Sequence, residues 1–427
     1  MLYRILQFIM KRSISAHYLE LKGIGFSTIP KKGPLLIAAT HPNSFLDALL
    51  LAVLINRPLH FLARSDVFKS KWSNYILRRI NLIPIYRLQE GQENLNKNER
   101  TFEECNKILE AGGAILIFAE GLSVIDLKLR PLKKGLARIA FGFAEKNNFS
   151  TNCEIVPVAI NYDRPTEFRS KILVGVGEMV KIADFEKAYK ESPSAGYKAL
   201  NKHVFKELKE HTIEVGEEDY LIYKAVTELD SCYQQNSLAR KKLIADHIFE
   251  ADKKNNEKFQ ELNNKTKEAF SILKKYGLNF RKLKVNNGLS LKNGLLLLLG
   301  LPLGLIAFVL NFLPFLIAKK ITDKKVKAIE FYASVRYVLG TVLWLLWIIA
   351  LTIIACFYSL IFLVTPLVLF ILLKYYLKYY EEYKYFRATY KLRLLKKNEG
   401  DYQKLQSLIV TIYRLRTTLG LSPKVGD

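Results

Sequence analysis

The sequence predicts an N-terminal α/β domain with a mixed, largely parallel sheet flanked by helices, then a helical insert and C-terminal membrane helices. Three observations carry this prediction. Between residues 34 and 180, short apolar strand-like segments alternate with helix-like segments. A Lys/Glu-rich stretch with helical periodicity follows at 193–280. Two long uncharged runs then occupy 295–318 and 337–373.

The net charge of +25 is spread unevenly over the 427 residues. We divide the chain into an α/β domain at 1–190, a charged helical region at 191–284 and a membrane region at 285–427. Their net charges are +10, +3 and +12. Basic residues beside apolar runs favour contact with anionic lipid headgroups. The chain has no zinc-finger spacing and no RNP-type motif, so we do not expect nucleic acid as a partner.

Each element of the α/β domain has a local signal. Short apolar runs bounded by turn residues predict strands at 35–39, 59–63, 114–118, 155–160 and 172–176. Helical spacing predicts helices at 45–56, 66–80, 98–111 and 134–147. The third helix stops at Gly112 and Gly113, a plausible helix end.

Two segments at the borders of this domain leave alternatives. Residues 1–10 are amphipathic and have no small-residue cleavage site, so they do not resemble a signal peptide. They predict either a membrane-surface helix or a docked core helix. The stretch 193–280 predicts two to four helices that cap or extend the domain. We favour a solvated insert over a lid or partner surface.

The two uncharged runs are long enough to enter a bilayer, which takes about 20 residues per span. In 295–318, Gly300, Pro302 and Gly304 lie near the middle and predict a bend. The run 337–373 suits two short spans, with a bend at 358–359 or 365–366.

The segments that flank these runs are basic, and basic segments favour the cytoplasmic side. We therefore expect two apolar hairpins, 295–318 and 337–373, that both return to the cytoplasmic side. A re-entrant form of the first hairpin and three simple crossings are the alternatives. The protein is expected to be an integral membrane protein with its α/β domain on the cytoplasmic side.

The first chemical motif is Thr-His-Pro-Asn-Ser-Phe-Leu-Asp at 40–47. It places His41 at a strand end and Asp47 in the next helical turn, and a carboxylate-held histidine can act as a general base. The alternative is a purely structural role, in which Ser44 and Asp47 form a capping box at the start of the helix. The pair His247/Asp252 has a similar spacing but lies in a charged helical stretch, and His60/Asp66 lies beside a strand. We reject the former and doubt the latter.

Three further motifs follow in order. Arg87 ends an apolar segment and can hold a phosphate with two parallel hydrogen bonds, although a plain surface arginine is the alternative. The block Phe-Ala-Glu-Gly-Leu-Ser at 118–123 supplies a carboxylate and a glycine at a sheet edge, and positive charge follows it. Pro157 interrupts an apolar strand, which is typical of an edge strand or a bulge. The candidate substrate-binding residues are Asn43, Arg87, Glu120, Gly121, Ser123, Arg130, Lys133 and Pro157.

The order and spacing of these four motifs resemble the glycerolipid acyltransferase family, over roughly residues 20–185. The resemblance implies that His41 is the general base and Asp47 its orienting carboxylate. It implies that Arg87 and the Glu120-Gly121 block hold a glycerol phosphate, and that Pro157 lies in a block associated with the acyl donor.

The sequence departs from the usual family pattern in two places. Five residues, in place of four, separate His41 from Asp47, and the form H-P-N-S-F-L-D resembles a variant of the family. Leu122-Ser123 stands where the family has Thr-Arg, so Arg130 or Lys133 is expected to take over that phosphate contact. The L-x-P-L-K-x-G continuation at 129–135 resembles the branch that includes fungal glycerol-3-phosphate acyltransferases.

The resemblance implies acyl transfer from acyl-CoA or acyl carrier protein to a hydroxyl of glycerol-3-phosphate or lysophosphatidic acid. No metal and no cofactor is expected. The expected partners are the acyl donor, the glycerol phosphate or lysophospholipid acceptor, and membrane lipid. The alternatives are an acyltransferase that remodels another lysolipid, an inactive membrane-anchored lipid-binding protein, and a hydrolase. The chain has no G-x-S-x-G elbow, which argues against a hydrolase.

Overall fold

The computed structural model describes residues 2–86, 97–125, 128–230, 238–254, 257–284 and 291–421. They form two units. The first unit consists of Met1–Thr212 and Asp323–Tyr337, and the second consists of Ile213–Thr322 and Val338–Asp427. The first unit therefore includes a short segment from between the two long apolar runs.

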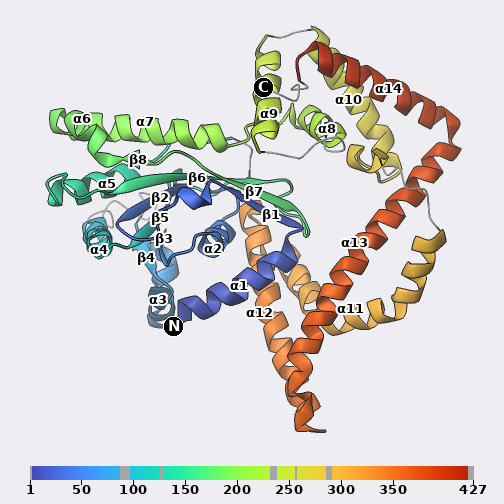
Figure 1. Cartoon of the computed structure of the whole chain (residues 1–427), viewed down its shortest axis with the longest axis horizontal. Coiled ribbons are helices and arrows are strands. Elements are labelled where there is room, and N and C mark those ends of the chain that lie inside the picture. The colour runs from blue at the N-terminus through green and yellow to red at the C-terminus, as the bar shows by residue number, and fades with distance from the viewer. Residues whose placement is uncertain are drawn as a thin grey trace. The chain divides into compact units, whose positions relative to one another are not determined.

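Among the described residues, the first unit is built on an eight-stranded sheet with the order β1-β7-β6-β2-β5-β3-β4, and β8 pairs with β6. Figure 1 shows the run from β6 through β2, β5 and β3 to β4. The strands are β1 (Glu20–Ile24), β2 (Leu35–Ala39), β3 (Leu59–Arg64), β4 (Leu82–Ile85), β5 (Ala114–Phe118), β6 (Glu154–Tyr162), β7 (Lys171–Val176) and β8 (Val180–Lys181). The five strands of that run are parallel, whereas β7 and β8 are antiparallel to β6. The predicted mixed, largely parallel sheet is confirmed.

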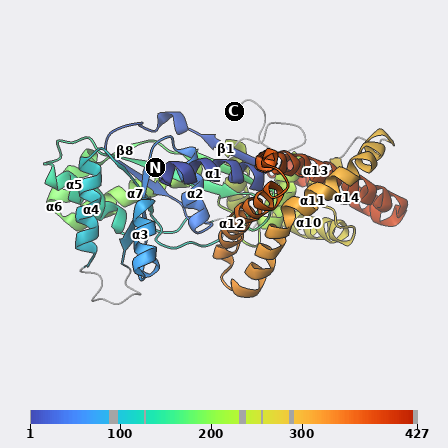
Figure 2. The ribbon, with the colours of Figure 1, turned by 90° about the horizontal axis from the view of Figure 1, so that it is seen from below.

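Helices cover this sheet. They are α1 (Leu2–His17), α2 (Phe45–Leu54), α3 (Lys71–Arg79), α4 (Asn98–Glu110), α5 (Gly135–Lys146), α6 (Glu186–Glu191) and α7 (Pro193–His211). One core joins the strands to α4, α5 and α7, and Figure 2 shows α4 beside α5 and α1 beside α2. Strand β2 is buried at all five positions, as in a strand that is covered on both faces. Helix α7 packs against β6, so the first unit extends beyond residue 190.

The expected strands correspond to β2, β3, β5, β6 and β7, and the structure adds β1, β4 and β8. The helix expected at 66–80 is divided into η2 (Ser65–Phe68) and α3. The division occurs because Ser70 starts a new helix: its Oγ accepts a hydrogen bond from the amide of Ser73 at 3.0 Å.

The N-terminal segment forms α1, which is docked on the first unit. Gln7 donates a hydrogen bond to the carbonyl of Ala52, and Ile14 is buried. Ile5 and Phe8 remain exposed, Phe8 to 63%. The burial of Ile14 agrees with a docked core helix. Because Ile5 and Phe8 are exposed, contact of α1 with a membrane surface stays a prediction.

The second unit has a helical core of its own. It is formed by α8 (Tyr220–Asp230), α9 (Leu238–Lys253), α10 (Glu257–Lys275), the end of α13 (Thr365–Lys397) and α14 (Glu399–Thr418). Helices α10 and α14 lie side by side (Figure 1). The helices at 213–284 thus share a core with the C-terminal tail. The division into three regions stays a prediction about the organisation of the chain.

Among the described residues, three helices are long and apolar enough to cross a membrane: α11 (Leu291–Lys325), α12 (Ile329–Cys356) and α13. Between α12 and α13, η7 (Leu360–Val364) breaks the run 337–373 near the expected bend, and Pro366 lies at the start of α13. The run 295–318, in contrast, is one continuous helix. Pro302 and Pro314 lie inside this helix, and the expected return of the run 295–318 to the side it entered stays a prediction.

Helix α11 remains continuous because neighbouring side chains satisfy its backbone. A proline inside a helix removes the hydrogen bond to the carbonyl four residues earlier, so Pro314 frees the carbonyl of Leu310. The indole Nε1 of Trp347 donates to this carbonyl at 2.9 Å. The hydroxyl of Tyr375 also donates to a carbonyl of this helix, that of Gly300, at 3.1 Å. Such contacts allow proline and glycine in helices that lie in lipid.

Candidate active site

The parallel sheet brings two of the sequence motifs to one edge. Strands β2 and β5 are paired neighbours, with Ala39 opposite Phe118. His41 and Glu120 each lie two residues beyond the end of their strand. The amide of His41 donates to Oε1 of Glu120 at 3.2 Å. The carboxyl ends of parallel strands are where ligands bind in open α/β sheets.

His41 and Asp47 form a close pair at this edge. The distance between His41 Nδ1 and Asp47 Oδ2 is 3.0 Å, and the two side chains are 13% and 0% exposed. An ionised carboxylate only accepts hydrogen bonds, so Nδ1 carries the hydrogen and Nε2 presents a lone pair. The imidazole ring also stacks on Phe118, with ring centroids 3.7 Å apart. The ring is thereby fixed in both position and tautomer.

Two further donors hold the Asp47 carboxylate. The amide of Asn43 donates to Oδ2 at 2.8 Å, and the phenol of Tyr162 donates to Oδ1 at 2.7 Å. Burial, followed by the nearby negative charge of Asp47, raises the pKa of Tyr162 well above its ordinary value. Tyr162 therefore stays protonated and serves as a donor. The side-chain amide of Asn43, itself buried, donates to the carbonyl of Pro165 at 3.0 Å.

The capping-box alternative for Asp47 is wrong. Ser44 is the N-cap of α2, but its side chain makes no capping hydrogen bond. Its backbone has φ +47°, an uncommon conformation for a residue other than glycine. The Ser44 amide instead donates to Oγ of Ser123 at 2.7 Å. The Asp47 carboxylate is hydrogen-bonded to His41, Asn43 and Tyr162 and does not accept from the amide of Ser44.

Glu120 links two backbone segments. Its Oε1 accepts from the amide of His41, and its Oε2 accepts from the amide of Arg130 at 3.1 Å. Burial raises the pKa of Glu120, whereas these two amides lower it. A carboxylate oxygen has two lone pairs, so each oxygen retains capacity for a hydroxyl donor.

Gly121 turns the chain after Glu120. It has φ +70°, and a Cβ there would lie 2.9 Å from Cγ of Lys133. The amide of Lys133 donates to the carbonyl of Ala119 at 2.8 Å, which fixes the basic segment beside the turn. The exposed Lys133 side chain thus crosses the turn where only glycine leaves room.

The acyltransferase family profile matches residues 22–161, from β1 to the end of β6. Over this stretch the chain is similar to the acyltransferase family. The matched stretch is about a third of the chain and includes His41, Asp47, Glu120 and Pro157.

Two curated enzymes and one solved structure are similar to this chain. It is 39% identical over 83 residues to glycerol-3-phosphate O-acyltransferase 1 of Saccharomyces cerevisiae, a match that covers 19% of this chain and 10% of the yeast protein. It is 28% identical over 184 residues to 1-acyl-sn-glycerol-3-phosphate acyltransferase of Bacillus subtilis, covering 41% of this chain and 82% of the bacterial one. The crystal structure of the Thermotoga maritima 1-acyl-sn-glycerophosphate acyltransferase PlsC has a TM-score of 0.35 and 19% identity, over 47% of this chain and 78% of that one. The chain thus spans only a tenth of the yeast relative.

Pro157 lies in an interior strand of the sheet of the first unit, so the edge-strand alternative is wrong. Along one side of β6, β8 pairs with Ile155 and β7 starts at Val158. Pro157 lies where the partner strand changes, and its carbonyl accepts from the amide of Gly177 at 2.9 Å. The missing amide hydrogen of proline therefore falls at the gap between the two partner strands.

The phosphate candidates are only partly described. Arg87 lies outside the described residues. Arg130 is half-buried, and its amide is tied to Glu120. Lys133 is exposed beside Gly121. The described structure therefore brings Arg130 and Lys133 close to the Glu120 turn, and their contact with a phosphate stays a proposal.

The two other histidine–aspartate pairs with similar spacing, His247/Asp252 and His60/Asp66, show no contact between imidazole and carboxylate in the described structure. His247 Nδ1 contacts the carbonyl of Gly420 at 2.8 Å. Asp66 pairs with Arg64, and no hydrogen-bond partner is found for Nδ1 of His60. Spacing alone did not produce a histidine–carboxylate pair at either position.

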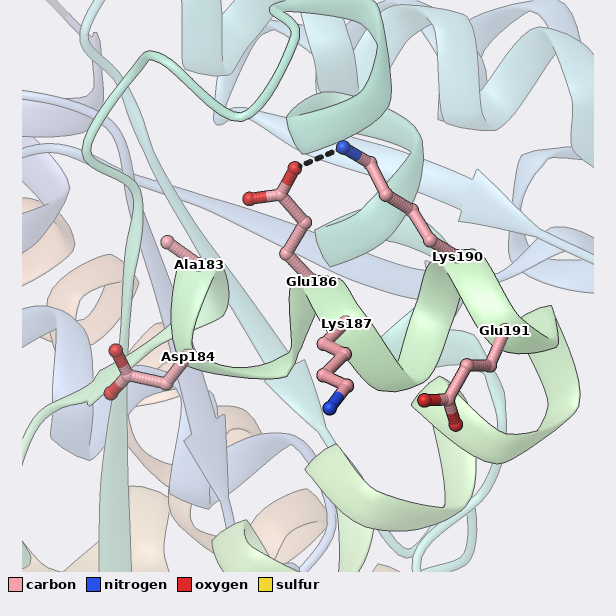
Figure 3. A pocket seen from close by; sticks show the side chains of 6 residues that line it. All are labelled: Ala183, Asp184, Glu186, Lys187, Lys190 and Glu191. Carbon is pink, nitrogen blue, oxygen red and sulfur yellow. Dashed lines mark ion pairs between the residues drawn. The ribbon is translucent and has the colours of Figure 1, made fainter.

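A surface hollow of about 630 Å³ lies away from these motifs, along η5 (Ile182–Phe185) and α6 (Figure 3). It is lined by Ala183, Asp184, Glu186, Lys187, Lys190 and Glu191. Lys190 and Glu186, one turn apart on α6, form an ion pair at 2.5 Å. These lining residues come from one helical segment and include no residue of the four motifs.

Tyr162 lies outside the four sequence motifs but belongs to the site. This tyrosine ends β6, which is parallel to β2, so it reaches the same sheet edge as His41. Its hydroxyl at the carboxyl end of a largely apolar strand was the available signal. Phe118 lies within the third motif, but the motif does not predict that its ring stacks on His41.

Proposed function

We propose that this acyltransferase domain moves a fatty acyl chain from a thioester, acyl-CoA or acyl carrier protein, to a hydroxyl of glycerol-3-phosphate or lysophosphatidic acid. Phospholipid synthesis is the process that this reaction serves. The single observation that carries the proposal is the His41–Asp47 pair at 3.0 Å, with a fully buried carboxylate at a sheet edge. Similarity of the matched stretch to the acyltransferase family supports it.

In the proposed reaction, Nε2 of His41 removes the proton of the acceptor hydroxyl while the oxygen attacks the thioester carbonyl. A C–O bond forms, and collapse of the tetrahedral intermediate breaks the C–S bond. The thiolate leaves and takes the proton from His41. Asp47 stabilises the imidazolium that forms between these steps. Tyr162 and the amide of Asn43 keep the carboxylate in place.

The acceptor phosphate is proposed to bind the basic side chains near this edge, namely Arg87, Arg130 and Lys133. Glu120 is proposed to accept a hydrogen bond from a glycerol hydroxyl with its remaining lone pairs. Asn43, Gly121 and Ser123 are proposed to shape the acceptor site, and Pro157 the donor side.

Both acceptors remain in the proposal because the relatives include enzymes named for each. Purified protein in detergent should be assayed with labelled acyl-CoA and acyl carrier protein. The acceptor panel contains glycerol-3-phosphate, lysophosphatidic acid and a neutral lysolipid. Acyl transfer to one of the phosphate acceptors, lost in His41→Ala, supports the proposal. Transfer to none of them contradicts it.

The apolar helices support membrane association. We propose that the first unit, the start of α11 and the start of α12 all lie on the cytoplasmic side. Ser334 of α12 contacts Asn43 of the acyltransferase domain within one unit, so the start of α12 lies on the side of that domain. No candidate span is found in the described residues before α11. We therefore propose that α11 is re-entrant, so that it begins and ends on one side, and that α12 and α13 form a hairpin across the membrane.

A further inference from the structure

A segment far outside the family match contacts the start of α2. Ser334 lies in the first turns of α12, is fully buried and belongs to the first unit. Its Oγ donates to the carbonyl of Asn43 at 2.6 Å, and it accepts from the amide of Leu46 at 3.3 Å. One hydroxyl thus bridges two backbone groups on either side of the N-cap of α2.

This bridge supplies a helix cap that α2 lacks locally. The first amides of a helix have no partner within the helix, and an N-cap side chain usually accepts from one of them. Ser44 occupies the N-cap but makes no such bond. Leu46 is the second residue of α2, and its amide donates a hydrogen bond to Oγ of Ser334. The cap therefore comes from a residue 288 positions away in the sequence.

The bridged peptide also holds the His41–Asp47 pair. The amide of Asn43 donates to Asp47 Oδ2, and the carbonyl of the same residue accepts from Ser334. Tilting this residue would move the donor that fixes the carboxylate. Ser334 is thus one residue removed from the carboxylate that orients His41.

Other residues of the same short segment fix its place on the first unit. Arg336 donates to the carbonyl of Thr166 at 3.0 Å, next to Pro165, which accepts from the side chain of Asn43. Tyr337 hydrogen-bonds with Ser13 of α1 and packs edge-on against His17 at 5.1 Å. Ser334 is therefore held where its hydroxyl meets α2.

We infer that Ser334 is a positioning residue for the His41–Asp47 pair, acting as the cap of α2 from the start of a membrane-region helix. The inference deepens the proposed function and depends on it for the catalytic readout. It makes the start of α12 a part of the working acyltransferase site.

The full-length protein in detergent tests this with three variants. Ser334→Ala removes the hydroxyl, Ser334→Thr retains it, and Thr352→Ala is the matched control. Thr352 lies on the same helix, and its Oγ1 bonds the carbonyl of Ile348 within that helix. If the whole contribution of a helix cap, about 0.5–2 kcal/mol, is lost from the transition state, kcat of Ser334→Ala should fall roughly 2- to 30-fold. Ser334→Thr should recover much of this loss, and Thr352→Ala should match the wild type.

A double-mutant cycle separates positioning from general destabilisation. If Ser334 acts through the pair, Ser334→Ala should cost much less in an Asp47→Asn background than in the wild type. Equal losses in both backgrounds would overturn the inference, because a merely unstable protein loses activity in either one.

Hydrogen exchange gives a readout that needs no substrate. Amides in the first turn of α2 should exchange faster in Ser334→Ala and at wild-type rate in Thr352→Ala. Unchanged exchange there would contradict the inference even if activity fell. If the first turn of α2 exchanges faster but the protein acylates no acceptor, the role of Ser334 as a cap is supported and only the proposed function is contradicted.

Discussion

The hydroxyl of Tyr162 donates a 2.7 Å hydrogen bond to Oδ1 of Asp47, on the opposite oxygen from the one that faces His41. The two residues are 115 positions apart and are both buried. Because Tyr162 ends β6 and Asp47 lies in α2, the bond joins the sheet to the helix that carries the carboxylate. It fixes Asp47 from the side that the histidine does not occupy.

Tyr162→Phe should lower kcat by roughly ten- to a hundredfold, because a hydrogen bond to a charged group is worth about 1.5–3 kcal/mol. Both KM values should change little. The control is Tyr189→Phe, which removes a 3.1 Å hydrogen bond to Glu145 on α5. Steady-state kinetics of the two variants decides; equal kcat in both would show that Tyr162 does not serve Asp47.

His41→Ala should lower turnover by about two to four orders of magnitude, the usual contribution of a general base. The unfolding temperature should stay close to that of the wild type. His247→Ala is the control, since its imidazole contacts a backbone carbonyl at 2.8 Å. Near wild-type turnover in His41→Ala would remove the proposed mechanism.

Arg87 is predicted, from the sequence, to bind the acceptor phosphate. A planar guanidinium matches two phosphate oxygens, and lysine keeps the charge but loses this geometry. Arg87→Lys should raise the acceptor KM, and Arg87→Ala should raise it further, by roughly one to two powers of ten. Donor KM should barely change.

The control for Arg87 is Arg100→Ala on the exposed side of α4. If only the donor KM responds to Arg87→Ala, Arg87 belongs to the donor surface. The phosphate contact is then to be sought at Arg130 or Lys133.

The proposed topology predicts a pattern of cysteine labelling in a cysteine-free background. Lys327→Cys before α12 and Ser407→Cys in α14 should both resist an impermeant reagent in intact cells. Tyr358→Cys should react, because Tyr358 lies between α12 and α13 and is 85% exposed. Labelling of Lys327→Cys from outside would refute the same-side placement of the two ends of α11.

Acid stability should depend on His17. Burial first, then the charges of Arg336 and Arg169, lowers the pKa of this imidazole to about 3, from 6.5. The unfolded chain therefore binds a proton between these pH values that the folded protein does not. Stability contributed by the neutral, buried ring is complete above about pH 6.5 and is lost as pH falls towards 3.

His17→Phe keeps the ring against Tyr18, Phe168 and Tyr337 but cannot bind a proton. Its free energy of unfolding should fall less steeply than that of the wild type between about pH 6.5 and 4. Denaturant unfolding at several pH values measures this. His203→Gln on α7 is the control, and an identical slope in wild type and His17→Phe would contradict the prediction.

The sequence alone was sufficient for the α/β alternation and for the meeting of His41 with Glu120. Apolar runs of four to six residues define strands, and parallel strands place the residues that follow them at one edge. His41 and Asp47 lie six positions apart across one strand–helix turn, so local structure brings them together. Such contacts depend on periodicity and turn chemistry, which a sequence displays directly.

The tertiary structure decided the contacts that cross the fold. Tyr162 and Ser334 resemble an ordinary core tyrosine and an ordinary helix serine in sequence, and their partners lie 115 to 291 positions away. Pro314 removes a backbone hydrogen bond from α11, and Trp347 of another helix donates to the carbonyl that is freed. Whether a buried polar group finds a partner depends on which helices and strands pack together. Local residue patterns specify the elements, but the packing of distant elements assigns their hydrogen bonds.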